Sequence, residues 1–137
     1  MVHHDASSSI VLTYKKKMLL SSSNLDSNGV PQELWSLIGG KKMDTQSPER
    51  TINRRIKFLT NLELENIRLL SKPGKNDKDK YYYHSELTDH DVNFMERREG
   101  QRLEFYTLEE LDNIILSSTT KLFVEENRDT VEELLAQ

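Results

Sequence analysis

The sequence predicts an α+β fold, a mixed central sheet flanked by helices, on three observations. Short apolar runs bounded by turn-forming residues, such as residues 10–14 and 18–20, are typical of strands. Apolar residues at helical spacing follow capping residues after Ser47 and after Thr107, which predicts helices there. The order of strands, helix, strands and further helices is typical of a domain in which helices cover a sheet.

Composition and charge restrict the class of protein. The chain has 137 residues, 35% of them hydrophobic and 31% charged, so we expect one domain over residues 1–137 with a disordered start at 1–7. The net charge of −4 gives no general attraction to nucleic acid or membrane, and we expect neither as a partner. The absence of cysteine excludes disulfides and thiolate zinc sites. Residues 1–5 lack the features of a secretion signal, so a cytoplasmic location is expected.

The first elements are a hairpin and a further strand. Residues 8–23 are predicted to form two strands joined by a tight turn, with Lys15-Lys16-Lys17 as a solvated tip. Residues 21–31 are rich in turn formers and are predicted to be a loop. A strand over residues 33–38 is expected to run into Gly39-Gly40, where the missing side chains permit a turn or a close approach.

The clearest helix signal covers residues 48–60. Ser47 supplies a capping hydroxyl, and Pro48 stands at the first helical position, where its missing N–H is not needed. Asn61 suits a left-handed stop. The predicted apolar face carries Ile52, Ile56 and Leu59.

The second half of the chain continues the pattern. Further strands are predicted over residues 62–70, 81–84 and 101–106. A capping box at Thr107 and Glu110 begins a short helix. Residues 119–136 predict a last amphipathic helix that bends or frays at 127–130.

Residues 40–62 carry the main functional signal. Gly40, Arg54, Ile56 and Leu62 have the spacing of the glycine, the arginine and two aliphatic residues in the pattern G-x5-E-x7-R-E-U-x-E-E-x-G-U, where U is aliphatic. The segment therefore resembles the Nudix box of the Nudix hydrolase superfamily. The segments 37–41, 47–49 and 99–111 also resemble family elements. The resemblance implies an α/β/α sandwich over most of the chain.

The catalytic positions of this box are degenerate. The family's glutamates are replaced by Gln46, Arg55, Phe58 and Leu59, and its second glycine by Asn61. In the family those carboxylates hold Mg²⁺ or Mn²⁺ around a diphosphate. Phe58 and Leu59 offer no donor atom, and Arg55 adds positive charge. We therefore expect no metal cofactor here.

The resemblance and the degenerate box together predict a pseudoenzyme. It would bind a nucleotide or another phosphorylated small metabolite without the metal-dependent pyrophosphohydrolysis of the family. Arg55 is the leading candidate, because a guanidinium at a former metal-ligand position offers a fork of donors to phosphate. The alternative, with equal weight, is that Arg55 faces solvent and pairs with Glu49 or Glu63. The expected ligand-binding residues are Arg55, Lys41, Lys42, Gln46 and Arg54, of which Arg54 is expected to bond the Gln46 amide.

Two other classes of function remain open at this stage. One is an enzyme with a rebuilt site, either a residual hydrolase of nucleoside-diphosphate derivatives using Mg²⁺ or Mn²⁺, or a metal-independent biosynthetic enzyme. Its candidate catalytic residue is Glu99, acting with Glu49 or Glu104, because some Nudix proteins supply a ligand or base from outside the box. The other is a structural partner domain that forms a homodimer. Weaker candidates for stacking on a nucleobase are Trp35 and residues 81–83.

Overall fold

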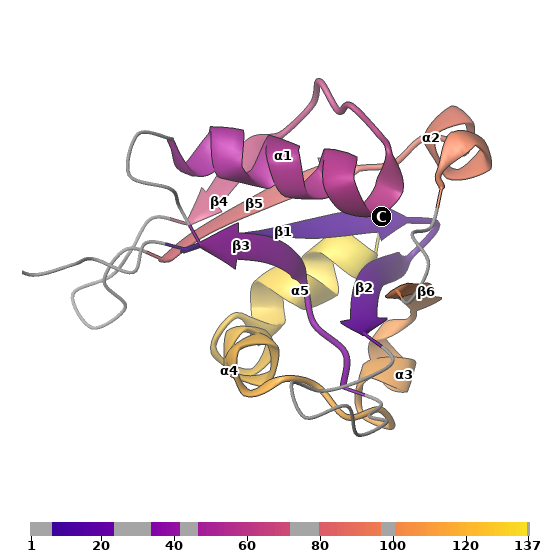
Figure 1. Cartoon of the computed structure of the whole chain (residues 1–137). Coiled ribbons are helices and arrows are strands. Elements are labelled where there is room, and N and C mark those ends of the chain that lie inside the picture. The colour runs from indigo at the N-terminus through magenta and orange to yellow at the C-terminus, as the bar shows by residue number, and fades with distance from the viewer. Residues whose placement is uncertain (1–6, 24–33, 42–46, 72–79, 97–100, 137) are drawn as a thin grey trace, which may run out of the picture. The chain divides into compact units, whose positions relative to one another are not determined.

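The computed structural model describes residues 7–23, 34–41, 47–71, 80–96 and 101–136. It has a six-stranded sheet in the order β4-β5-β1-β2-β6, with β3 paired to β1 (Figure 1). The expected α+β fold, a mixed sheet flanked by helices, is confirmed. None of the helices in the described ranges has the length and apolar character needed to span a membrane. The chain forms two compact units, Met1–Leu12 with Ile38–Glu96, and Thr13–Leu37 with Arg97–Gln137.

The strands of the first unit bring distant segments together. Strand β1 (Ser7–Tyr14), which continues into the second unit, pairs antiparallel with β3 (Ile38–Lys41). In this register Ser8 lies opposite Gly40. Strands β4 (Arg68–Ser71) and β5 (Lys80–Glu86) form a second antiparallel pair. The buried apolar residues of the unit include Ile10, Val11, Leu12, Ile38, Ile52, Ile56 and Leu59.

Helix α1 (Pro48–Thr60) lies along the strands of this unit (Figure 1) and is confirmed in both its ends. The Ser47 hydroxyl accepts a bond from the backbone N–H of Arg50 at 3.1 Å. Asn61 ends the helix at φ 61°, in the left-handed region, and its N–H donates to the Lys57 carbonyl. Because Ile52 and Ile56 are almost completely buried, the rotation of the helix about its own axis is fixed.

Two predictions in the first unit are wrong. The strand expected over residues 62–70 is limited to β4, because the buried N–H of Leu62 donates to the Thr60 hydroxyl instead of to a ladder. The segment after Thr88 was expected to be a polar stretch, but it forms helix α2 (Asp89–Phe94). Thr88 and Asp91 make a capping box for α2. None of its residues is buried, so no apolar periodicity marked it in the sequence.

The second unit contains the hairpin tip and its partner strand. Strand β2 (Lys17–Ser23) pairs antiparallel with the end of β1 and with β6 (Gln101–Tyr106), as predicted. Of the strand expected over residues 33–38, Trp35 and Ser36 form only isolated bridges, to Leu116 and Ser21, before β3 begins at Ile38. The backbone groups of this stretch pair with two different segments, so it does not extend one ladder.

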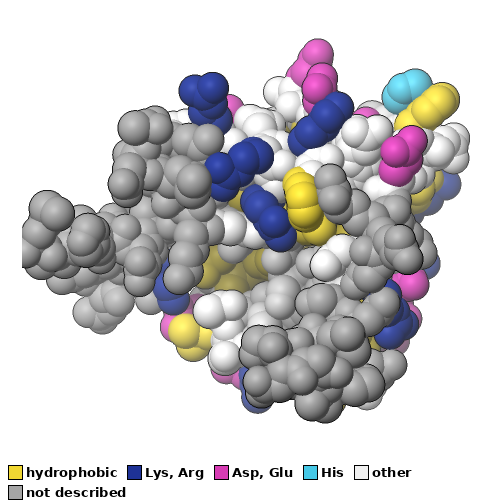
Figure 2. Space-filling model, in the orientation of Figure 1, with side chains coloured by type: hydrophobic (Ala, Val, Ile, Leu, Met, Phe, Trp, Pro, Cys, Tyr) yellow, Lys and Arg dark blue, Asp and Glu magenta, His cyan; other side chains and the backbone are white. Residues whose placement is uncertain are grey.

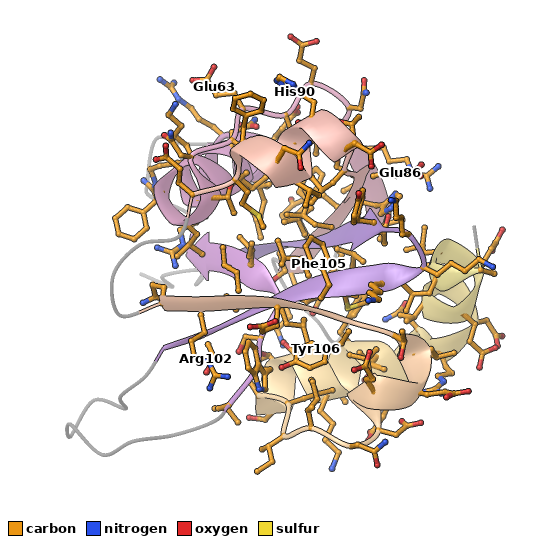
Figure 3. The ribbon with its side chains drawn as sticks, turned by 90° about the vertical axis from the view of Figure 1, so that its right-hand side faces the viewer. Glu63, Glu86, His90, Arg102, Phe105 and Tyr106 are labelled. Carbon is orange, nitrogen blue, oxygen red and sulfur yellow. The ribbon has the colours of Figure 1, made fainter. Side chains whose placement is uncertain are left out.

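The side chains of β6 alternate as a strand requires, with Phe105 and Tyr106 on opposite sides (Figure 3). Trp35 is only 3% exposed. Its ring meets Tyr106 edge-on at 5.1 Å between centroids, and the Arg102 guanidinium carbon lies 5.1 Å from it. Trp35 is therefore a packed residue of this unit and not an open surface for a nucleobase.

The capping box that begins α3 (Leu108–Leu111) is confirmed. Thr107 accepts from the N–H of Glu110 at 3.2 Å, and Glu110 accepts from the N–H of Thr107 at 2.9 Å. The predicted last helix is two helices, α4 (Ser118–Glu126) and α5 (Arg128–Leu135). They divide at Asn127, inside the range where a bend was expected.

The hairpin turn yields a first prediction. Lys15 and Lys16 have φ values of 48° and 66°, a conformation that favours asparagine and glycine and costs a lysine about 1–2 kcal/mol. The double variant Lys15→Asn/Lys16→Gly is expected to raise the free energy of unfolding by about 1 kcal/mol, measured by denaturant titration. The control Lys17→Asn alters β2, not the turn, and is expected to give no gain. A double variant no more stable than the wild type contradicts this interpretation.

A second prediction concerns His84 on β5. It is 5% exposed, and its Nδ1 accepts a bond from Arg68 Nε at 3.2 Å. Burial, and secondly the charge of Arg68, lower the pKa of His84 from 6.5 to about 4. Because the unfolded chain therefore binds the proton first, the stability present above pH 6.5 is lost as the pH falls towards 4.

The size of this loss is expected to be on the order of 2 kcal/mol. Denaturant titrations of the wild type and of His84→Gln between pH 7 and pH 4 measure it. The variant is expected to lose less stability than the wild type over that range. Parallel pH profiles would show that His84 is not held in its neutral form by the fold.

Candidate functional site

The degenerate box lies where β3 meets α1, and its glycines permit a close approach. A Cβ on Gly40 would lie 3.0 Å from Cγ and 3.1 Å from Cδ of Arg55. A Cβ on Gly39 would lie 2.4 Å from the carbonyl oxygen of Ser8, which is a backbone clash. The close approach that the glycine pair predicts is thus the packing of β3 against β1 and against the Arg55 side chain.

Arg55 is held in place by this strand. Its Nε donates to the Gly39 carbonyl oxygen at 3.0 Å, and its side chain is half-buried. Its guanidinium carbon lies 5.3 Å from the centroid of the Phe58 ring, one helical turn further on. Burial, and secondly the charge of Arg54, lower the pKa of Arg55 from its ordinary value. The guanidinium therefore lies in a place where positive charge is under-compensated.

The alternative expectation for Arg55 is wrong. Arg55 does not face solvent freely, and within the described ranges no ion pair joins it to Glu49 or Glu63. Glu63 instead pairs with Lys57 at 3.3 Å. The physical reason is the tether to Gly39, which directs the guanidinium along β3 rather than out towards the helix surface.

Positive charge is concentrated on α1. The helix carries four cationic side chains and one acidic side chain, namely Arg50, Arg54, Arg55 and Lys57 against Glu49. Basic side chains gather over α1 in the space-filling view, with a hydrophobic side chain among them (Figure 2). Arg54 is exposed. A local basic surface thus exists on a chain whose net charge is −4.

Ser8 adds an unmatched hydroxyl beside this surface. It is 1% exposed, and among the described residues its Oγ is the buried side-chain atom that lacks a hydrogen-bond partner. Residues directly opposite in an antiparallel pair present their side chains on the same face. Since Ser8 lies opposite Gly40, and a Cβ on Gly40 would meet Arg55, Ser8 lies on the face that Arg55 crosses.

The described box positions do not fit a divalent cation. Arg55 presents a guanidinium, Phe58 a ring that is 43% exposed, and Leu59 a side chain that is 2% exposed in the core. None of these side chains has a donor oxygen, whereas Mg²⁺ and Mn²⁺ require several. In the part of the chain that the structure describes, no three His, Asp or Glu side chains are grouped as metal ligands.

The structure leaves several predicted site residues without geometry. Lys42, Gln46 and Glu99 lie outside the described residues, and of Lys41 only the backbone, at the end of β3, is described. Consequently the expected bond between Arg54 and Gln46 stays a prediction. Glu49 is exposed in the first turn of α1.

Other predicted site acids have structural partners or separate positions. Glu104 is on β6, in the second unit. Asp91 is engaged in the capping box of α2, and Glu96 accepts a bond from the Asn61 amide at 3.3 Å.

Sequence reasoning missed two members of the site. Phe58 was read only as a lost metal ligand, although an aromatic residue three positions after an arginine on a helix predicts their contact. Ser8 depends on the pairing register of two strands separated by thirty residues of chain, roughly, and no local signal reveals such a register. The Gly39 carbonyl, as a backbone acceptor, also has no residue-type signature.

The comparisons with known proteins bear on the fold. No protein-family model matches the chain, and no curated protein matches it. Among solved structures, a MutT from work on Aliivibrio salmonicida and Vibrio cholerae superposes with a TM-score of 0.67 at 15% identity, covering 96% of this chain and 97% of that one. The Nudix domain of Shewanella oneidensis NrtR, in complex with ADP ribose, gives 0.68 at 16% identity, covering 96% and 90%.

A MutT/Nudix family protein from Listeria innocua gives a TM-score of 0.65 at 18% identity, with full coverage of both chains. Likenesses of this extent over the whole chain define the fold. The protein therefore has the Nudix fold, as the resemblance of residues 40–62 implied. At these identities the likeness carries no residue roles, so the chemistry must be argued from the site itself.

The glycine pair yields a third prediction. Gly39→Ala is expected to lower the free energy of unfolding by about 2 kcal/mol, because the new Cβ meets a backbone oxygen that cannot move alone. Gly40→Ala is expected to cost less, because the Arg55 stem can shift aside. Denaturant titration of both variants measures the difference. Equal losses, or a larger loss for Gly40→Ala, would contradict the packing described here.

Proposed function

We propose that this protein is a Nudix-fold binding module that holds a phosphorylated, nucleotide-like small ligand without metal-dependent hydrolysis. The observation that carries the proposal is Arg55, half-buried and tethered through Nε to the Gly39 carbonyl. It stands at a box position where the Nudix pattern has an acid. The site that we assign to the ligand's phosphate is the surface of α1 around Arg55, with Arg54 beside it.

The tether suits Arg55 to phosphate binding. Nε is committed to Gly39, and the two terminal nitrogens carry the N–H groups that bond an oxyanion as a fork. Since the Nε bond and the contact with Phe58 already restrict the side chain, less conformational entropy is lost when a ligand binds. The lowered pKa of Arg55 has the direction expected where a nearby cation and partial burial disfavour its charge. A bound anion relieves both effects.

The remaining predicted ligand residues extend this proposal. Lys41, Lys42 and Gln46 follow Gly40 in sequence, and the proposal places them around the same phosphate. Hydrolysis assisted by Mg²⁺ or Mn²⁺ is not assigned, because Arg55, Phe58 and Leu59 supply no oxygen ligand. The ADP ribose bound by the NrtR domain of the same fold supports the choice of a nucleotide derivative as the probe.

Calorimetric titration with ADP-ribose tests the proposal. Binding is expected to the same extent in EDTA and in Mg²⁺. Arg55→Gln is expected to weaken it about tenfold or more, because charge-assisted bonds to phosphate contribute about 1.5–3 kcal/mol. Arg50→Gln, which removes an equal charge from the same helix, is the matched control and is expected to weaken binding less than about threefold.

Product analysis separates the binding module from the rebuilt enzyme. Incubation of the wild type with ADP-ribose and Mg²⁺ or Mn²⁺ is expected to release no AMP. Release of AMP that is abolished in Glu99→Gln would establish the enzyme alternative and overturn the proposal. Loss of binding in EDTA, or equal weakening by Arg50→Gln and Arg55→Gln, would also contradict it.

A further inference from the structure

We infer that Phe58 and Arg55 together form a stacking platform for a nucleobase, so that the ligand is a mononucleotide derivative and not a base-free sugar phosphate. The inference rests on the proposed function, since it names the ligand class of the same site. It depends on a residue that the Nudix pattern would have as an acid and that this chain has replaced by an aromatic ring.

The ring is large, apolar and accessible. Phe58 is 43% exposed, although α1 buries Ile52, Ile56 and Leu59 on its opposite face. An isolated exposed apolar side chain is common on a protein surface. This one, however, lies among the cations of α1, where a ring gains nothing from its charged neighbours unless it stacks with them or with a ligand.

The geometry joins the ring to the anion site. The guanidinium carbon of Arg55 lies 5.3 Å from the ring centroid, and Nε of Arg55 is fixed on Gly39. A ligand whose phosphate bonds Arg55 therefore has Phe58 within the reach of one ribose. Bases stack both on phenylalanine rings and on guanidinium planes, whichever base is present. The pair thus matches a ligand that is flat and apolar at one end and anionic at the other.

The site favours one base rather than a strand of nucleic acid. Proteins that bind single strands offer several aromatic residues to successive bases along a basic groove. Phe58 is the one aromatic residue in the sequence of α1. The net charge of −4 also opposes a polyanion over the rest of the surface.

Two probes separate the ring from the charge. ADP and inorganic pyrophosphate both carry a diphosphate, but only ADP carries a base. Phe58→Ala is expected to weaken ADP binding about tenfold, within the range of a lost base stack, and to change pyrophosphate binding less than about twofold. Phe58→Trp is expected to retain ADP binding. Arg55→Gln is expected to weaken both probes.

Phe94 offers the matched control. It is a phenylalanine of the same unit, 64% exposed on α2, and its ring stacks on His90 at 4.4 Å. Phe94→Ala is expected to leave both affinities unchanged. Circular dichroism confirms that each variant is folded, and saturation transfer from the aromatic protons of the protein to the adenine protons reports the stack in the wild type.

The outcomes separate this inference from the proposed function. Equal weakening of ADP and pyrophosphate by Phe58→Ala, or no weakening of ADP, overturns the stacking platform and leaves the anion site standing. Pyrophosphate binding without ADP binding in the wild type also overturns the platform alone. Failure of both probes to bind the wild type overturns the platform and the anion site together.

Discussion

The hydrogen bond from Arg55 Nε to the Gly39 carbonyl is the interaction on which the site depends. It requires a strand that comes close to α1, and Gly40 permits this because it has no side chain in the path of the Arg55 stem. It also requires a helix with a fixed start and rotation. The Ser47 cap sets the start, and the burial of Ile56 next to Arg55 in sequence sets the rotation. Backbone packing thus places one guanidinium at the edge of the core.

The electrostatic character of the box follows from the same residues. A Nudix site of the ordinary pattern gathers carboxylates, which repel one another until a cation joins them. Here the described positions gather cations, and Arg54 and Arg55 disfavour each other's charge until an anion joins them. The same fold and helix therefore present the inverse charge. A phosphate can be bound directly, in a place where the ordinary pattern would bind it through a metal ion.

The parts of the fold that local chemistry decides were predictable from sequence. The caps of α1 and α3 and the hairpin of β1 and β2 each depend on a few neighbouring residues. Prediction failed where distant partners decide. Leu62 bonds a side-chain hydroxyl instead of a strand, and α2 buries nothing that would mark its period. At the site, the residue type of Arg55 indicated an anion, but two orientations were equally open until the Gly39 carbonyl was seen to hold it.

Nitrogen-15 NMR of the arginine side chains, recorded in EDTA while ADP is added, tests the central claim most directly. Slow exchange of the Arg55 Nε–H is expected before ADP is added, because that group is bonded to Gly39. On addition, the terminal N–H signals of Arg55 are expected to shift and to show slowed rotation, as they would on a phosphate, while those of Arg50 stay unchanged. If ADP binds and the Arg55 signals do not respond, this guanidinium is not the anion-binding group and the account is wrong.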